Sequence, residues 1–448
     1  MKVATFHPVR LCGSAIVPPA KSEAHRALLL AALGDGTCCL QGFPQPLCED
    51  IQAMINGITA LGATVCWAED ALTVVPAPKR EINDAPKTFH VNACAAALRM
   101  LIPAFWSRGQ AVCITMEPGL FARPLDAFIP LAEQSGGQMI LTPPKGENPA
   151  MVELKGKMDA GEYEVDGSLS SQFASGLLIA LAHGTDAAGC SAPSRLTITP
   201  PIVSRPYLNM TLAQMKEFQI PFQETEEGVF SLPGGCGENP EKGQVTGDWS
   251  QGAVLLCADA MGSHISVQGL PMPAADKPAL QGDARILEAL EKMGLSLRNT
   301  GDGIGVKNIT SSDLLPLTLD CTDIPDIAPI LALTLTRAQG TSHLTGVKRL
   351  RVKECDRLAA TEKWLTQMGV TVKISEDSDM LSISGLPGGQ KLKGGFTADA
   401  QGDHRMVMLL ATAALVADAP ITVTGVESLD KSWPGFLETY QKLGGLIS

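Results

Sequence analysis

The stretch RVKECDRLAATEKWLTQMGVTV, residues 351–372, holds the pattern that decides the fold. Leu358, Leu365 and Met368 recur at helical spacing, which predicts an amphipathic helix. Gly369 follows directly, and glycine suits the left-handed residue that ends many helices. Apolar and polar residues alternate after it, as they do in a half-buried strand. The stretch therefore predicts a helix, a sharp turn and a strand.

The same helix ending occurs six times along the chain. The residue at the turn is glycine in five copies and Gln219 in the third, and successive copies are 74, 83, 75, 75 and 75 residues apart by subtraction. The glycines are Gly62, Gly136, Gly294, Gly369 and Gly444. The helix-like segments are residues 51–65, 126–139, 208–222, 286–297, 358–372 and 436–447. We therefore expect six copies of one α/β unit.

Each copy also contains a second, more apolar helix. These helices are predicted at residues 26–33, 96–105, 173–182, 253–261, 327–336 and 406–416. Six units are too many for one hydrophobic core, so we expect two domains of three units each. The Gly- and Pro-rich stretch SLPGGCGENPEKG, residues 231–243, marks the expected break between them.

The composition indicates a globular protein rather than a nucleic-acid or membrane protein. The chain has 448 residues, of which 45% are hydrophobic and 18% charged, and its net charge of -12 argues against a general nucleic-acid binder. The longest apolar run, about residues 406–417, is shorter than the roughly 20 residues that cross a bilayer, and no signal-like segment opens the sequence. The twelve cysteines lack CxxC or metal-site spacing, so we expect reduced, mostly buried thiols in a cytoplasmic protein.

Polar clusters precede the apolar helices. They include PPAKSEAHR (18–26), DGSLSSQ (166–172), GDWSQ (247–251), DIPD (323–326) and GDHR (402–405). Taken singly, each has a simple explanation, because Ser, Asp and Gly cap helices. On that interpretation Ser22 and Asp326 are helix caps, and His404 is a structural imidazole. The pair Ser170 and Ser171 is also explained by capping.

Taken together, the clusters concentrate cations in an acidic protein. They contain Lys21, Arg26, Lys353, Arg357 and Arg405, and further candidates are Arg99, Arg123 and Lys431. Helix N-termini favour anions, so helix starts from two domains that face a common cleft would bind several anionic groups. A carboxylate pair in that cleft, Asp326 and Glu354, would be able to move protons.

Lys353 and Arg357 are four residues apart, which predicts that they share one helix face. Like charges there repel each other, and cations face the wrong end of the helix dipole. An anion bound between them would remove both penalties. The alternative is a solvated helix start that Glu354 and Asp356 neutralise.

Ten motifs in these regions and beyond follow one another in a known order. They are AKSEAHRALLLAAL (20–33), ARPLDAFIPLAEQSGG (122–137), DGSLSSQF (166–173), VSRPYL (203–208), GDWSQ (247–251), QGDARILEALEKMG (281–294), IPDIAPILA (324–332), RVKECDRLAA (351–360), GDHRMVM (402–408) and LDKSWPGF (429–436). In these motifs the chain resembles the 5-enolpyruvylshikimate-3-phosphate synthase (EPSP synthase) family, the enolpyruvyl transferases of aromatic amino-acid biosynthesis. The resemblance covers the chain from one end to the other.

The resemblance implies an α/β fold of the inverse α+β barrel type. Two domains would each contain three βαβαββ repeats, with the active site in the cleft between them. The first strand, about residues 2–17, would belong to the C-terminal domain. The expected domains are therefore residues 19–243, and residues 1–18 together with 244–448.

The resemblance also implies the reaction. The 5-hydroxyl of shikimate-3-phosphate attacks C2 of phosphoenolpyruvate while C3 is protonated, and the tetrahedral intermediate then loses phosphate. No metal or organic cofactor is expected. The expected partners are these two substrates, not nucleic acid or a membrane, and the protein is expected to be a monomer.

The motifs assign the site residues. Catalytic positions are matched by Asp326, Glu354, Lys21 and His404. Shikimate-3-phosphate is expected to contact Lys21, Ser22, Arg26, Ser170, Ser171, Gln172, Ser204, Tyr207, Asp326 and Lys353. Phosphoenolpyruvate is expected to contact Lys21, Ala95, Arg123, Gln172, Arg357, Arg405 and Lys431. Asp326 matches the residue beside the attacking hydroxyl, and Glu354 matches the proposed proton donor to C3.

One segment departs from the family pattern. Where the family has a Gly-containing turn of the form E-S-G-S-T-L-R or N-A-G-T-A-M-R, this chain reads NACAAALR, residues 92–99. The glycine becomes Ala95, which does not easily take a positive φ and whose methyl group narrows a close backbone approach. Two hypotheses follow. The protein is an active enzyme with a tighter phosphoenolpyruvate pocket that resists glyphosate, or it only binds shikimate-3-phosphate.

The other motif residues favour the active enzyme, because an abandoned site has no reason to keep them. They are Asp326, Glu354, Arg357, Arg405 and Lys431. A third reading is the sister transferase that acts on UDP-N-acetylglucosamine. It is disfavoured because the matching loop, EPGLFAR at residues 117–123, lacks the reactive cysteine of that family.

Overall fold

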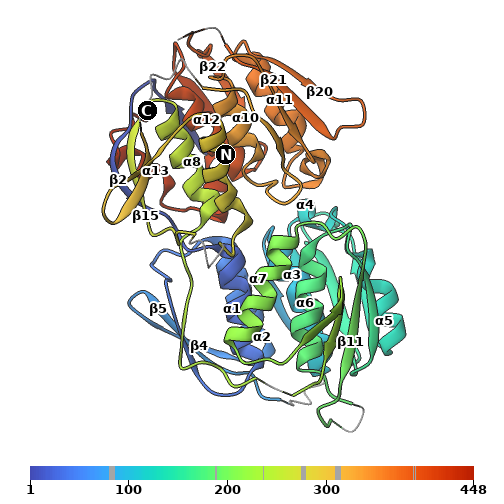
Figure 1. The fold of residues 1–448 in the computed structure, drawn as a ribbon. Helices are drawn as coiled ribbons and strands as arrows, with labels where there is room; N and C mark the ends of the chain where they lie inside the picture. The colour runs from blue at the N-terminus through green and yellow to red at the C-terminus, as the bar shows by residue number, and fades with distance from the viewer. Residues whose placement is uncertain are drawn as a thin grey trace. The chain divides into compact units, whose positions relative to one another are not determined.

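The structure, a computed structural model, describes residues 1–79, 86–186, 189–235, 237–273, 279–307, 314–386, 388 and 390–448. The chain divides into two compact units (Figure 1). Unit 1 consists of Met1–Pro18 and Thr246–Ser448, and unit 2 consists of Pro19–Val245. Each unit has its own hydrophobic core.

Unit 2 contains, in its described residues, three βαβαββ repeats that each form a four-stranded sheet. The first repeat is β14 (Lys242–Gln244), α1 (Lys21–Leu33), β3 (Cys38–Gln41), α2 (Glu49–Leu61), β4 (Thr64–Ala68) and β5 (Ala71–Val75). The second is β6 (Lys87–His90), α3 (Ala95–Arg108), β7 (Val112–Met116), α4 (Pro118–Phe121), η1 (Asp126–Phe128), α5 (Ile129–Ser135), β8 (Gln138–Thr142) and β9 (Ala150–Lys155). The third is β10 (Glu162–Asp166), α6 (Ser171–Ala182), β11 (Ser194–Thr199), α7 (Arg205–Glu217), β12 (Gln223–Glu226) and β13 (Val229–Leu232).

Over the residues that the structure describes, unit 1 follows the same plan, with four-stranded sheets in its first two repeats and a three-stranded sheet in its third. Its first repeat is β2 (Cys12–Ile16), α8 (Trp249–Ala260), β15 (His264–Gln268), η2 (Gly282–Arg285), α9 (Ile286–Lys292), β16 (Leu297–Asn299) and β17 (Gly303–Val306). The second is β18 (Thr318–Asp320), α10 (Ala328–Leu335), β19 (Thr341–Thr345), η3 (Lys348–Val352), α11 (Arg357–Gln367), β20 (Thr371–Ile374) and β21 (Met380–Ser384). The third is β22 (Phe396–Asp399), α12 (His404–Ala414), β23 (Ile421–Thr424), η4 (Val426–Lys431), α13 (Phe436–Lys442) and β1 (Val3–Phe6). These repeats confirm the predicted α/β fold class.

The sheets share one strand order. The opening strand pairs parallel with the second strand, as in β6–β7 and β18–β19, and the later strands pair antiparallel. Among the described residues, three sheets take a strand from a distant part of the chain: β14 pairs parallel with β3, β2 pairs parallel with β15, and β1 pairs antiparallel with β23. A single N-terminal strand over residues 2–17 was the wrong prediction. The segment forms two strands, because β1 pairs antiparallel with β23 in a different sheet from β2.

The six outer helices end as the repeat predicts. All five repeat glycines have positive φ, between 73° and 111°. Gln219 takes the same left-handed conformation, with φ of 53°, although its side chain carries a Cβ. The position therefore has one backbone conformation in every copy, whichever residue occupies it.

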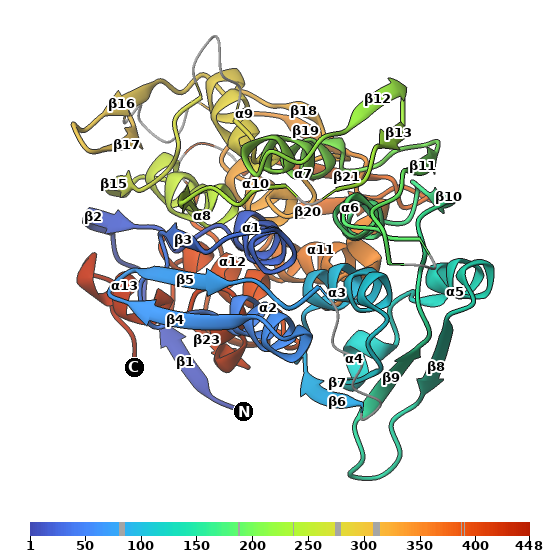
Figure 2. The same ribbon diagram turned by 90° about the horizontal axis from the view of Figure 1, so that it is seen from below.

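The more apolar helices form the interior of each unit. From the fourth residue onward α1 is buried on every side, and α6, α8, α10 and α12 are buried almost throughout. A helix that is apolar all round needs partners on all faces. Accordingly α8, α10 and α12 pack against one another, and in unit 2 the sheets lie around α1, α3 and α6 (Figures 1 and 2). Within each unit, this packing therefore brings together the polar residues at the starts of these helices.

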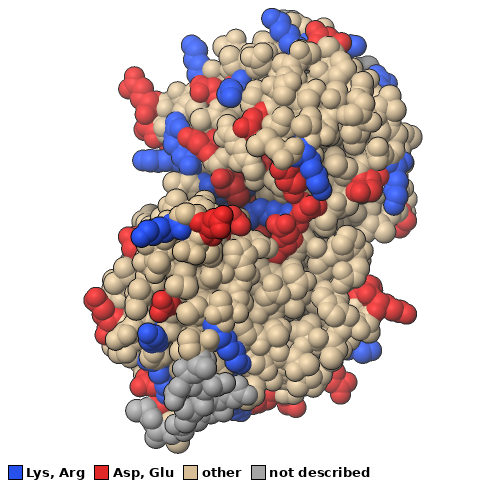
Figure 3. Space-filling view, turned by 180° about the vertical axis from the view of Figure 1, so that it is seen from behind, with Lys and Arg blue, Asp and Glu red and all other residues tan. Residues whose placement is uncertain are grey.

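The structure also shows the burial of the cysteines and the distribution of charge on one face. The eleven described cysteines are all free, and five of them are buried, so the prediction that most are buried is wrong. Lys and Arg are interspersed with Asp and Glu over the face shown in Figure 3. Among the described residues, no helix is both long and apolar enough to span a membrane.

Candidate active site

Arg357 is the centre of the polar cluster in unit 1. Its side chain is 2% exposed and lies at the first residue of α11. Its Nε and one terminal nitrogen donate to Asp403 at 2.7 and 3.2 Å. The terminal nitrogens also donate to Asp326 Oδ1 and Glu354 Oε2, both at 2.8 Å. Burial lowers the pKa of the guanidinium, but the three carboxylates raise it well above its ordinary value.

Asp326 lies where three cations converge. Its Oδ1 accepts from Arg357 and, at 3.2 Å, from Lys353 Nζ, while its Oδ2 lies 4.0 Å from Arg405. Burial alone would raise the pKa of this carboxyl, but the three cations hold the pKa well below its ordinary value. The alternative that Asp326 caps a helix is wrong, because Ile327 is the N-cap of α10.

The spacing predicts that Lys353 and Arg357 share a helix face, but in the structure they do not. It has extended backbone, with φ of −88° and ψ of −158°, and lies before the helix starts. The cap of α11 is Asp356, whose carboxylate accepts from Ala359 N at 2.9 Å. Lys353 and Arg357 are instead brought together by their shared contact with Asp326. Burial also lowers the pKa of Lys353.

The start of α12 is tied to the start of α8. Asp403 caps α12 by accepting from Arg405 N at 2.8 Å. The Arg405 side chain donates to the carbonyl and the hydroxyl of Ser250, at 3.2 and 2.8 Å. His404 is buried, with Nδ1 3.8 Å from the Asp403 carboxylate. Lys431 is also buried, at the end of η4. We call Asp326, Lys353, Glu354, Arg357, Asp403 and Arg405 the unit 1 cluster.

Sequence reasoning gave no role to Asp283, although it lies in the motif QGDAR. Its residue is 3% exposed, in η2, which packs against α8. Burial, with Asp326 and Asp248 nearby, raises the pKa of its carboxyl to about 7 against the lowering effect of Arg405 and Lys353. The sequence shows an acidic residue at position 283, but nothing in the local sequence indicates that it is buried.

Unit 2 holds Arg26 among neutral partners. Its Nε donates to Thr211 Oγ1 at 2.7 Å, and its terminal nitrogens donate to Ser175 Oγ at 3.1 Å and to the carbonyls of Ser22 and Tyr207 at 2.7 and 3.0 Å. These contacts join α1 to α6 and α7. Burial lowers the pKa of Arg26 to about 10. Ser22 lies in the first turn of α1, whose N-cap is Ala20, so the capping alternative for Ser22 is wrong.

Lys21 pairs with a carboxylate that the sequence did not single out. Its Nζ lies 2.9 Å from Oδ2 of Asp50, in the first turn of α2. An acidic residue at the start of a helix is common, so nothing in the local sequence marks Asp50 as a partner of Lys21. Lys21 and Arg26 contact different elements, although both start from α1.

The start of α6 is linked to α3. Ser170 caps α6 by accepting from Gln172 N at 3.3 Å, as the capping interpretation predicts, and Ser171 is the first helical residue. Arg99 donates to Gln172 Oε1 at 3.0 Å and to the carbonyl of Pro124 at 2.9 Å. The half-buried Arg123 precedes that proline.

Ser204 and Tyr207 lie at the start of α7. Ser204 is buried and has a positive φ of 56° as N-cap. Positive φ in a non-glycine residue is uncommon and is concentrated at functional sites. Tyr207 is in the first turn, and its carbonyl accepts from Arg26. We call Lys21, Arg26, Asp50, Arg99, Gln172 and Ser204 the unit 2 cluster.

Ala95 has no backbone strain. It is the first residue of α3 and is 5% exposed, and the residue with positive φ in this turn is Asn92, at 50°. The expected conflict between alanine and a positive φ therefore does not arise. Compared with the glycine of the family pattern, Ala95 therefore adds a methyl group but no backbone strain.

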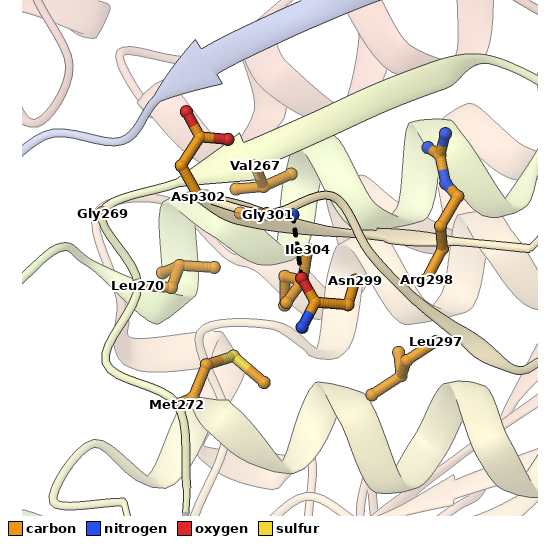
Figure 4. Close-up of a pocket in the computed structure, with 11 residues that line it drawn as sticks. Val267, Gly269, Leu270, Met272, Leu297, Arg298, Asn299, Gly301, Asp302 and Ile304 are labelled. Atoms are coloured by element: carbon orange, nitrogen blue, oxygen red, sulfur yellow. Dashed lines mark hydrogen bonds between the residues drawn. The ribbon is translucent and has the colours of Figure 1, made fainter.

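A further pocket in unit 1 lies apart from these clusters. It has a volume of about 360 Å³ and lies beside β15 and β17. Leu270, Met272, Leu297 and Ile304 give it an apolar lining, and Asn299 Oδ1 accepts from Gly301 N at 2.9 Å (Figure 4). None of the predicted site residues lines it.

Comparison with known proteins identifies the family. The family model described as EPSP synthase (3-phosphoshikimate 1-carboxyvinyltransferase) matches residues 7–440. The protein named 3-phosphoshikimate 1-carboxyvinyltransferase from Clostridium beijerinckii is 31% identical over 449 residues, covering 99% of this chain and 97% of its own. The protein of that name from Clostridioides difficile is 32% identical, with the same coverage. This chain belongs to the EPSP synthase family.

Solved structures share the fold of this EPSP synthase family member. EPSP synthase from Acinetobacter baumannii superposes with a TM-score of 0.77 at 23% identity, covering 100% of both chains. The enolpyruvyl transferase NikO from Streptomyces tendae gives a TM-score of 0.75 at 17% identity, covering 100% of this chain and 98% of its own. The resemblance stated from the motifs is therefore confirmed, both in family and in fold.

Proposed function

We propose that the protein transfers the enolpyruvyl group of phosphoenolpyruvate to the 5-hydroxyl of shikimate-3-phosphate, releasing phosphate. The observation that carries the proposal is the position of Asp326, whose carboxylate lies among Lys353, Arg357 and Arg405. A base held between fixed cations suits a reaction of two phosphorylated substrates. Family membership and relatives of the same name at 31–32% identity support the same reaction.

The proposed chemistry is an addition followed by an elimination. Asp326 takes the proton of the 5-hydroxyl as its oxygen bonds to C2, and Glu354 or Lys21 gives a proton to C3. The C2–O bond to phosphate then breaks, phosphate leaves, C3 returns a proton to Glu354 or Lys21, and the enol ether remains. His404 is a secondary participant. The predicted position of the site between the two domains stays a prediction.

Substrate binding would raise the basicity of Asp326. Its carboxyl has a low pKa because three cations surround it, and such a carboxylate is a weak base. Each phosphate or carboxylate that pairs with Lys353 or Arg405 removes part of that field. Asp326 would therefore become an effective base when the anionic substrates are bound.

The proposed contacts follow the motifs. For shikimate-3-phosphate they are Lys21, Ser22, Arg26, Ser170, Ser171, Gln172, Ser204, Tyr207, Asp326 and Lys353. For phosphoenolpyruvate they are Lys21, Ala95, Arg123, Gln172, Arg357, Arg405 and Lys431. The four side-chain hydrogen bonds described for Arg357 go to carboxylates, so we also propose that it orients Asp326 and Glu354. We further propose a cytoplasmic monomer that needs no metal or organic cofactor.

Phosphate release from the two substrates tests the proposal. Asp326→Asn keeps the shape of the side chain but removes the base, so kcat should fall by about 10²- to 10⁴-fold. The matched control is Asp377→Asn, an exposed aspartate in a turn of the same unit. The proposal fails if the wild-type protein releases no phosphate. Calorimetric binding of shikimate-3-phosphate without release would then support the binding-only alternative.

The Ala95 methyl group leads to a second proposal about this site. We propose that it narrows the phosphoenolpyruvate pocket, so that glyphosate, which is longer, binds poorly. Ala95→Gly should then increase inhibition by glyphosate while phosphate release continues. Equal inhibition curves for the wild type and Ala95→Gly would contradict this proposal.

A further inference from the structure

Two residues on one face of α1 contact Asp50, one at its side chain and the other at its backbone carbonyl. Lys21 and His25 are four residues apart on α1, which places them on the same helix face. Lys21 Nζ lies 2.9 Å from Oδ2 of Asp50, and His25 Nε2 donates to the backbone carbonyl of Asp50 at 2.9 Å. The side chain and the backbone of Asp50 are thus fixed by the same face.

The His25–Asp50 contact is buried, and the Lys21–Asp50 contact is partly buried. The Lys21 and Asp50 side chains are 16% and 9% exposed, and His25 is 1% exposed. Burial lowers the pKa of His25 to about 4, against smaller raising effects of Asp50, so its imidazole is neutral at pH 7. A neutral ring that donates from Nε2 holds the carbonyl without adding charge beside Lys21.

The ion pair meets two electrostatic requirements at once. Lys21 is the first residue of α1, where the helix dipole disfavours a cation, and Asp50 is in the first turn of α2, where the dipole favours an anion. A lysine side chain also loses considerable rotamer freedom when it binds a ligand. If a carboxylate already holds the ammonium in place, less of this side-chain entropy is lost when the ligand binds.

We propose that Asp50 is a positioning residue: it holds the Lys21 ammonium in the orientation in which it meets a phosphorylated substrate. This inference rests on the proposed function of Lys21 as a ligand of shikimate-3-phosphate and phosphoenolpyruvate. Asp50 itself touches no substrate in this proposal.

A double-mutant cycle on shikimate-3-phosphate binding tests the proposal. Asp50→Asn keeps the shape but removes the charge, and should weaken calorimetric binding and lower kcat/KM for phosphate release by roughly 10- to 100-fold. In a Lys21→Met background the same change should have almost no further effect on binding, because Asp50 acts through Lys21. Additive losses in the two backgrounds would overturn the proposal.

Two further variants separate positioning from stability. Asp50→Glu keeps the charge and should recover binding in part. Asp35→Asn breaks an exposed Lys79–Asp35 pair of the same 2.9 Å length, with side chains 61% and 48% exposed, and should leave binding unchanged. If binding loss in Asp50→Asn and Asp50→Glu follows the loss of Tm rather than the loss of charge, the role is structural and the proposal fails. Wild-type phosphate release is measured separately, so failure of the proposed function is distinguished from failure of the cycle.

Discussion

Arg357, the first residue of α11 in unit 1, and Arg26, in the second turn of α1 in unit 2, are both buried arginines, but their partners differ in kind. Arg357 donates to three carboxylates, whereas Arg26 donates to two hydroxyls and two carbonyls. Their pKa values shift in opposite directions: carboxylates raise that of Arg357, and burial lowers that of Arg26 to about 10. The cations of the unit 1 cluster are therefore balanced by carboxylates in direct contact, whereas the hydrogen bonds of Arg26 go to neutral groups and the charge of Glu23 offsets part of its own.

The difference suggests a division of work under the proposed function. Carboxylates that share protons with surrounding cations are suited to proton transfer, so we assign proton movement to the unit 1 cluster. A cation whose hydrogen bonds go to neutral groups keeps more of its field for a ligand, so we assign electrostatic attraction of the anionic substrates to Arg26. The same residue type thus has two uses, set by its partners.

The largest expected effect comes from removing each arginine in turn. Arg357→Met removes the buried cation that contacts Asp326, Glu354 and Asp403, and should lower the free energy of unfolding by about 3–5 kcal/mol at neutral pH because the carboxylates lose their shared partner. This cost should shrink as the pH falls, because the unpaired carboxylates become protonated and neutral. Arg26→Met leaves hydroxyls and carbonyls as the former hydrogen-bond partners and removes a charge that acts on Glu23 and His25, so its cost should change less with pH than that of Arg357→Met.

Urea unfolding of both variants at several pH values provides the measurement. The control is the wild type at each pH, which removes the contribution of all other titrating groups. If the two costs change with pH in the same way, the contrast between charged and neutral partners is wrong.

A further pH-dependent effect is expected from Asp283. Its carboxyl has a pKa of about 7 when folded, above the ordinary value of 3.8, so the folded state binds the extra proton between these pH values. Its contribution to stability is therefore present at low pH and is lost as the pH rises through 7. Asp283→Asn should gain stability over the wild type by at most about 1.4 kcal/mol for each pH unit between 4 and 7.

Unit 2 should respond in the opposite direction in that range. Burial lowers the pKa of His25 and of His183 from 6.5 to about 4, so the unfolded state binds more protons and stability falls as the pH drops below 6.5. The measurement for Asp283→Asn is again urea unfolding from pH 4 to 8. If the stability difference between Asp283→Asn and the wild type is constant from pH 4 to 8, Asp283 does not titrate as described.

The sequence predicts well what repeats and poorly what depends on distant partners. The inner helices follow from apolar runs, and the outer helices from their spacing and terminal glycines, because both signals are local. Asp50 is 29 residues from Lys21, and Arg357 is 46 residues from Asp403, so these pairs exist only in the folded unit. The predicted shared face of Lys353 and Arg357 failed because the chain is extended at Lys353. Local spacing could not show that Asp326 would bring them together.

The smallest predicted effect concerns the helix endings, where the two units also differ. In unit 1 all three outer helices end at glycines, but in unit 2 the third ends at Gln219, an exposed residue with φ of 53°. A residue with a Cβ is disfavoured in this conformation, so Gln219→Gly should stabilise unit 2 by up to about 1 kcal/mol. The reciprocal control is Gly136→Ala, at φ of 73° and with no heavy atom within 4 Å of the added Cβ, which should destabilise it by a similar amount. Because the Gln219 side chain is exposed, a loss of stability in Gln219→Gly would mean that this side chain makes a contact worth more than the strain it imposes.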